Sequence, residues 1–114
     1  MYYKKSQAQQ FTIPGGTDGV LYPAHPKGEQ SIAYIEMEGE YPVGGYSFND
    51  VCTETLYMQE GHFTVEYGGE TFELDPGDVL MLLPGKKYRT WGKGKAVIVI
   101  TPSWDKAQNH IITL

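Results

Sequence analysis

Glycine and proline recur along this chain at intervals too short to leave room for long helices. Turn signals such as "IPGG", "YPAHPKG", "YGGE", "DPGD" and "LPGK" separate segments of strand length. At such positions proline fixes φ and glycine accepts positive φ, so each pair favours a turn. With 14 Gly and 7 Pro in 114 residues, the spacing predicts many short strands in one all-β domain.

The regular part of the pattern begins at Ser31. Its predicted strands are "SIAYIEME", "GGYSFND", "CTETLYMQ", "HFTVEY", "ETFEL", "VLMLL", "KYRTW" and "KAVIVITP". We expect Glu60-Gly61 and the glycines 92 and 94 to end strands, and "VLMLL" to be a buried one. Without a long helix to cover a face, such strands must pack against each other. Residues 31–103 are therefore predicted to form a small antiparallel β-barrel.

The two ends of the chain carry weaker signals. Residues 1–30 are expected to be a partly irregular N-terminal arm, with a short strand around Val20 to Tyr22. The apolar residues of this arm predict that it packs on its own barrel or on a partner subunit. Residues 104–114 are expected to be a tail, packed on the barrel or on a partner subunit, with one helical turn or a terminal strand.

Charge and cysteine content limit the classes of partner and the compartment that we expect for this protein. The formal net charge is −5, and the basic clusters Lys86-Lys87 and Lys93 to Lys95 are small and close to turns, which disfavours nucleic-acid binding. Cys52 is the only cysteine, so a reducing compartment is expected. The N-terminus lacks an apolar signal segment, and the longest apolar runs are far short of a membrane span. We expect a cytoplasmic protein without a nucleic-acid or membrane partner.

Glu54 lies in a segment that otherwise alternates like a half-buried strand. It shares the parity of Cys52, Leu56 and Met58, so if those side chains point inward, Glu54 does too. A carboxyl group without a partner in a core would cost several kcal/mol, whereas one near a barrel mouth could face a ligand. Apolar neighbours should raise its pKa, which suits general acid or base chemistry.

Two stretches resemble the motifs of the cupin family. "ETLYMQEG" places Glu54 and Gly61 as in the first motif, and "PGDVLMLLPGKKY" places Gly77, Gly85 and Tyr88 as in the second. The resemblance covers about residues 31–101. It implies a double-stranded jelly roll and a homodimer.

The ligand positions of metal-binding cupins are altered here. The resemblance implies histidines at Phe48 and Asp50, or at Ser47 and Asn49, and a third histidine at Tyr88; only Glu54 matches. Imidazole nitrogens are the donors that such metals prefer. We therefore expect no metal and no cofactor. A less favoured alternative is an unorthodox metal site built from Glu54, Asp50, Cys52 and Tyr88.

The predicted site combines these residues at the barrel mouth. Glu54 and Tyr88 are the candidate catalytic residues, and the candidate ligand-binding residues are Asn49, Asp50, Cys52 and Thr90. Purely structural roles are the alternatives. Glu54 would then serve to hold the barrel mouth in register, Tyr88 would serve to fill space, and Cys52 would be a small buried hydrophobic residue. Cys52 is not expected to be a nucleophile, because Glu54 beside it would raise the thiol pKa.

The predicted function is binding of a small polar molecule in the barrel mouth without a typical metal. Nine tyrosines in the chain hint at a sugar, since aromatic faces match apolar C–H patches; a hydroxy-acid is also possible. One carboxyl and one phenol could run proton transfer next to a carbonyl, as in an isomerase or epimerase. The alternatives are a metal-dependent oxygenase or isomerase and a non-catalytic dimeric binding or sensor protein.

Overall fold

The computed structural model describes residues 1–114 and confirms an all-β protein. One curled sheet contains nine strands, and every strand pairing is antiparallel. The strands are β1 (Gln9–Ile13), β2 (Thr17–Leu21), β3 (Ser31–Tyr41), β4 (Gly45–Asn49), β5 (Thr53–Tyr67), β6 (Glu70–Leu74), β7 (Val79–Leu82), β8 (Tyr88–Thr101) and β9 (Asn109–Thr113). Two short 3₁₀ turns, η1 (Lys5–Gln7) and η2 (Lys106–Gln108), complete the chain. No helix is long and apolar enough to cross a lipid bilayer.

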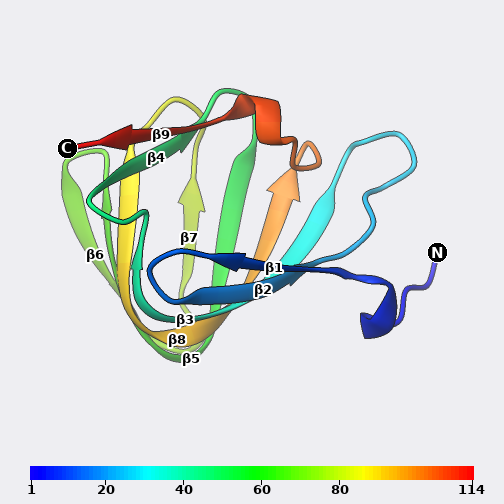
Figure 1. Ribbon diagram of the computed structural model, residues 1–114, viewed down its shortest axis with the longest axis horizontal. Helices are drawn as coiled ribbons and strands as arrows, with labels where there is room; N and C mark the ends of the chain where they lie inside the picture. The colour runs from blue at the N-terminus through cyan, green and yellow to red at the C-terminus, as the bar shows by residue number, and fades with distance from the viewer.

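Three long strands form the wall of the half-barrel. β8 lies between β3 and β5 and pairs with both along most of its length. In Figure 1 these strands curve around one side of the molecule, while β4 and β9 close the opposite rim. Curvature of this kind lets a sheet bury one face against itself without covering helices.

Glycines that sequence alone predicts to end strands instead lie inside them. Glu60-Gly61 falls within β5, next to a register shift between Met58 and Glu60, and Gly92 and Gly94 fall within β8. Gly61 pairs with Gly94, and Gly92 pairs with Gly39 of β3. A Cβ at Gly61 would collide with the backbone of β8. Aligned glycines and a bulge allow neighbouring strands to bend together, so the strands continue where separate hairpins were expected.

The concave face of the sheet holds the main core. It contains Met37, Leu56, Met58, Phe63, Val65, Tyr67, Leu74, Leu82, Tyr88 and Ala96. The segment "VLMLL" contributes less to this core than predicted. In β7, Leu82 is buried but Val79 and Met81 are exposed, because adjacent side chains of a strand point to opposite faces.

A hairpin of the N-terminal arm and a strand of the tail both pair with the barrel. β1 and β2 form a hairpin through Gly15 and Gly16, both with positive φ, and β2 pairs with β3. The arm is thus more regular than the short strand expected around Val20. The tail has both predicted features, because η2 is a short helical turn and β9 pairs with β4. In Figure 1 the hairpin and the tail lie on the two sides of the barrel opening.

Candidate functional site

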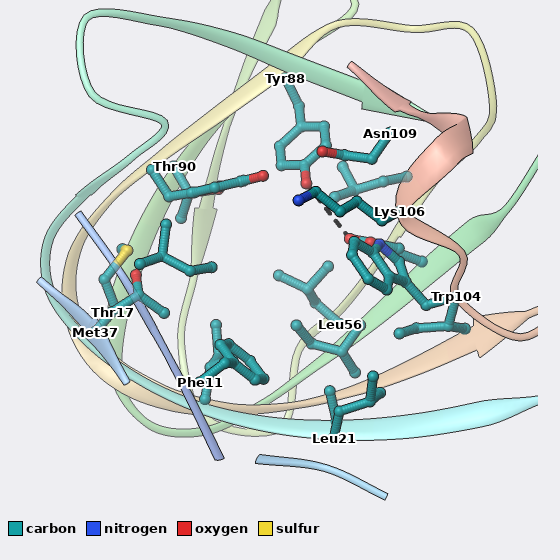
Figure 2. Close-up of a pocket in the computed structure, with 18 of the residues that line it drawn as sticks. Phe11, Thr17, Leu21, Met37, Leu56, Tyr88, Thr90, Trp104, Lys106 and Asn109 are labelled. Atoms are coloured by element: carbon teal, nitrogen blue, oxygen red, sulfur yellow. Dashed lines mark hydrogen bonds between the residues drawn. The ribbon is translucent and has the colours of Figure 1, made fainter. Parts of the chain in front are cut away.

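A cavity of about 480 Å³ lies inside the half-barrel. It is lined by side chains from β1, β2, β3, β5, β7, β8, η2 and β9, and by Trp104 in the loop before η2. Thirteen of the 20 lining residues are hydrophobic, so a few polar groups must determine how a ligand is oriented. Figure 2 shows these groups around the apolar floor that includes Phe11, Leu21 and Leu56.

Glu54 points into this cavity from the middle of the sheet. It pairs with Leu82 of β7 on one side and Ile100 of β8 on the other, and only 9% of its surface is exposed. Leu56 and Met58 are buried with the same parity, as the alternation predicted. Burial raises the pKa of the Glu54 carboxyl, although hydrogen bonds with Asn49 and Tyr88 partly oppose the rise. The carboxyl is therefore easier to protonate than an exposed one.

Tyr88 lies beside Glu54, and a hydrogen bond joins the two side chains. Its hydroxyl donates a hydrogen bond to Oε2 of Glu54 at 3.4 Å. The pKa of Tyr88 lies well above its usual value. The larger cause is the burial of the phenol, and the second is the negative charge of Glu54. The Tyr88 ring also packs at a tilt against Tyr41, with centroids 6.3 Å apart. The phenol therefore stays neutral and acts as a hydrogen-bond donor.

Asn49 is buried and does not line the cavity. Its Oδ1 accepts hydrogen bonds from Nε2 of Gln108 at 3.1 Å and from Nδ2 of Asn109 at 3.0 Å. Oε1 of Gln108 in turn accepts from the backbone N–H of Cys52 at 3.1 Å. Asn49 thus joins β4 to the tail through side-chain hydrogen bonds, and it partly offsets the raised pKa of the Glu54 carboxyl.

The remaining three candidate residues lie in different parts of the structure. Thr90 is buried and lines the cavity. Asp50 is exposed, and its Oδ2 lies within hydrogen-bond distance of Nε2 of His110, at 2.6 Å. Cys52 is buried in a small cluster with Ala33 and Ile100, outside the cavity lining.

Asp50 and Cys52 therefore lie away from the place expected for ligand contacts. The strand begins only at Thr53, so the alternation that orients Glu54 does not extend back to Asp50. Burial, with the charge of Glu54 as a second cause, raises the pKa of the Cys52 thiol. A thiol of this kind is a poor nucleophile.

The donors near Glu54 do not fit a transition metal. No three His, Cys, Asp or Glu side chains come together in a group that could hold a metal ion. His62 contacts Asp75 at 2.9 Å on the exterior, and His110 is occupied by Asp50. Around Glu54 the structure places the phenol of Tyr88 and the amide of Asn49 instead of imidazole nitrogens.

Several lining residues were not identified from the sequence. Thr17, Lys106 and Asn109 reach the cavity from the arm and the tail, where no motif marks them. Phe11, Ile13 and Leu21 belong to the apolar residues of the arm, for which the sequence predicts packing but not a place in a cavity. The alternation of "QFTI" is the one local signal that could have placed a strand there.

Comparisons with known proteins agree with this architecture. A family model described as the EutQ-like cupin domain (Cupin_3) matches residues 26–101. A search of the curated proteins found no match.

Solved structures share the fold at low sequence identity. Pac13 of Streptomyces, described as a nucleoside dehydratase, aligns with a TM-score of 0.88 at 15% identity, over 100% of this chain and 92% of its own; a variant of it was solved with uridine. KdgF from Halomonas sp. aligns with a TM-score of 0.74 at 14% identity, over 94% of this chain and 97% of its own. An RmlC-like cupin from Shewanella frigidimarina aligns with a TM-score of 0.75 at 19% identity, over 93% of this chain and 94% of its own.

At these identities the structural likeness establishes the fold only. The cavity and the fold together fit small-molecule binding or catalysis of the cupin type. The family match covers two thirds of the chain, including every strand from β3 to β8. This chain belongs to the EutQ-like cupin domain family, within the cupin superfamily.

Proposed function

We propose that this protein binds a small polar molecule in its barrel cavity, and that Glu54 and Tyr88 transfer protons at a carbon next to a carbonyl group. The observation that carries the proposal is a buried carboxyl, hydrogen-bonded to a neutral phenol, inside a cavity of about 480 Å³. This volume lies within the range of roughly 300–1,000 Å³ that is usual for small-molecule sites.

The two side chains have complementary roles in this chemistry. The ionised Glu54 carboxylate, whose pKa is raised by burial, is a stronger base than an exposed one and takes the proton from the carbon. When substrate binds, the Tyr88 hydroxyl turns its single O–H from Glu54 to the carbonyl oxygen, where negative charge develops, and this frees the carboxylate to act as the base. Protonation of the former carbonyl carbon gives isomerisation, when the hydroxyl of the original carbon loses its proton and the former carbonyl oxygen gains one. Protonation of the original carbon from the opposite face gives epimerisation.

The same intermediate also allows a third outcome. Loss of a hydroxyl group from the next carbon, with a proton added to make water, gives dehydration. This is the reaction class named for Pac13, and it supports including nucleosides among the candidate ligands.

Two alternatives have less support. A non-catalytic barrel closed by its own side chains does not match a cavity of about 480 Å³. A metal-dependent oxygenase would need donors that the surroundings of Glu54 do not supply.

A ligand screen followed by isotope exchange tests the proposal. Uridine, monosaccharides and small hydroxy-acids are screened by thermal shift, because a ligand that binds the native state raises its stability. Each binder is then incubated with the protein in D₂O, and NMR follows deuterium entering the carbon next to its carbonyl.

Glu54→Gln should abolish the exchange, and Tyr88→Phe should slow it by about 10²–10⁴-fold. Glu60→Gln is the matched control, because Glu60 is an exposed carboxyl on the same strand and pairs with Lys95 on the surface. Exchange that survives in Glu54→Gln at the wild-type rate would show that the carboxyl is not the base.

The homodimer expected from the family resemblance stays a prediction. Exposed apolar side chains on the outer face of the long strands and β7 support it, namely Ile32, Tyr57, Val79 and Met81. Light scattering of the purified protein would give its mass directly.

A further inference from the structure

The cavity contains only two charged side chains, and they have opposite signs. Among the 20 lining residues, Glu54 is the only acidic one and Lys106 is the only basic one. Glu54 is buried, whereas Lys106 is exposed and stands at the opening. A charged group of a ligand would keep more of its hydration near Lys106 than beside Glu54.

Lys106 is held in place by the short turn η2. Oδ1 of Asp105 accepts a hydrogen bond from the backbone N–H of Ala107 at 3.0 Å, which caps this turn. Gln108 ties the end of the turn to Asn49. Figure 2 shows the Lys106 side chain extended over the cavity, on the same side as Tyr88 and Trp104.

The ammonium group of Lys106 has no partner within the protein. The close contacts between basic side chains and carboxylates involve Lys95, Arg89, His62 and His110, and none includes Lys106. The neighbouring Asp105 carboxylate is engaged with the backbone of η2. A lysine that lines a cavity without a counter-ion is available to bind an anion.

A second unpaired polar group lies elsewhere in the cavity. Thr17 lines the cavity, but its hydroxyl oxygen is shielded from solvent, with 3% of the residue exposed, and it has no hydrogen-bond partner. Figure 2 places Thr17 beside Met37, on the other side of the cavity from Lys106. A buried hydroxyl normally finds a partner. A ligand supplies one here when the Thr17 side chain turns about χ1 and brings its hydroxyl into the cavity.

We propose that the natural ligand of this cavity is an anionic polyol, whose carboxylate or phosphate pairs with Lys106 while one of its hydroxyl groups bonds Thr17. This inference rests on the proposed function and narrows its substrate class. The anionic group stays at the opening, near solvent, and the uncharged body of the ligand extends inward past Glu54 and Tyr88. A ligand held in this way presents its hydroxyl-bearing carbons, and not its charge, to the carboxyl.

Matched pairs of compounds test the charge requirement. Glucose with glucuronate, ribose with ribose 5-phosphate, and uridine with uridine 5′-phosphate differ within each pair by an anionic group. Dissociation constants are measured by calorimetry at low ionic strength. We expect the anionic member of at least one pair to bind about 10- to 100-fold more tightly than its neutral partner. Which pair responds distinguishes a carboxylate from a phosphate.

Variants of the two anchoring residues complete the test. Lys106→Met should remove most of the preference for the anion and leave the neutral compound unaffected, while Lys106→Arg should keep much of it. Thr17→Val should weaken both members of a pair. Lys93→Met is the matched control, because Lys93 is exposed, lies outside the cavity and forms no ion pair.

The outcomes separate this inference from the proposed function. Equal binding of neutral and anionic members, or an anion preference that survives in Lys106→Met, overturns the inference and leaves a small-molecule site in place. If no compound of either kind binds, both proposals fail. An equal loss of the anion preference in Lys93→Met would also overturn the inference, because the effect would then come from overall charge.

Discussion

Replacing Thr17 by valine should stabilise the protein while weakening ligand binding. The Thr17 hydroxyl is buried in the cavity wall and has no hydrogen-bond partner. Valine has nearly the same shape, is also β-branched and suits the strand β2. The substitution therefore removes an unsatisfied polar atom and adds little steric change.

The magnitude follows from the cost of burying an unpaired hydroxyl. Such a group costs about 1–3 kcal/mol in proteins, so Thr17→Val should raise the free energy of unfolding by about that amount. For a chain of this length each kcal/mol corresponds to roughly 4 °C in the thermal midpoint. In urea the midpoint should rise by roughly 0.5 M or more.

Urea unfolding of both proteins, followed by tryptophan fluorescence, measures the difference. Thr12→Val is the matched control in the same hairpin, because the Thr12 hydroxyl donates a hydrogen bond to Asp18 at 2.8 Å and its loss should not stabilise. If Thr17→Val unfolds at the same urea concentration as the wild type, or at a lower one, with an unchanged slope, the reasoning is refuted. The hydroxyl would then have a partner, such as a bound water, in the free protein.

Two further predictions concern the carboxyl and the bend of the sheet. Because burial raises the pKa of Glu54 above 4.5 in the folded state, the folded protein binds this proton more tightly than the unfolded chain, and stability is lost as pH rises from 4.5 through the raised pKa. The stability of Glu54→Gln relative to the wild type should therefore increase with pH in that window; a flat difference in thermal midpoints would contradict the assigned burial. Gly61→Ala should destabilise by about 1–3 kcal/mol, because Gly61 has a φ of 79° and faces the β8 backbone closely; chemical denaturation checks this, and a neutral result would mean that the bend at the bulge is not constrained.

The local alternation of residues was enough to predict part of the site. Glu54, Leu56 and Met58 share one face because successive side chains of a strand point in opposite directions, and this holds wherever the strand is placed. The family motifs then placed Tyr88 next to Glu54, and the structure shows the hydrogen bond between them. Alternation failed for Asp50, because the regular strand begins only after it.

By itself, the sequence determined the all-β class, the hairpin at Gly68-Gly69 and the inward direction of Glu54, since each depends on residues close together in the chain. Only the tertiary structure decided that Gly61 and Gly92 bend continuous strands, and that Thr17 and Lys106 meet the same cavity from the two ends of the chain. The physical reason is that backbone preferences act over a few residues, whereas the lining of a cavity depends on which distant strands pair.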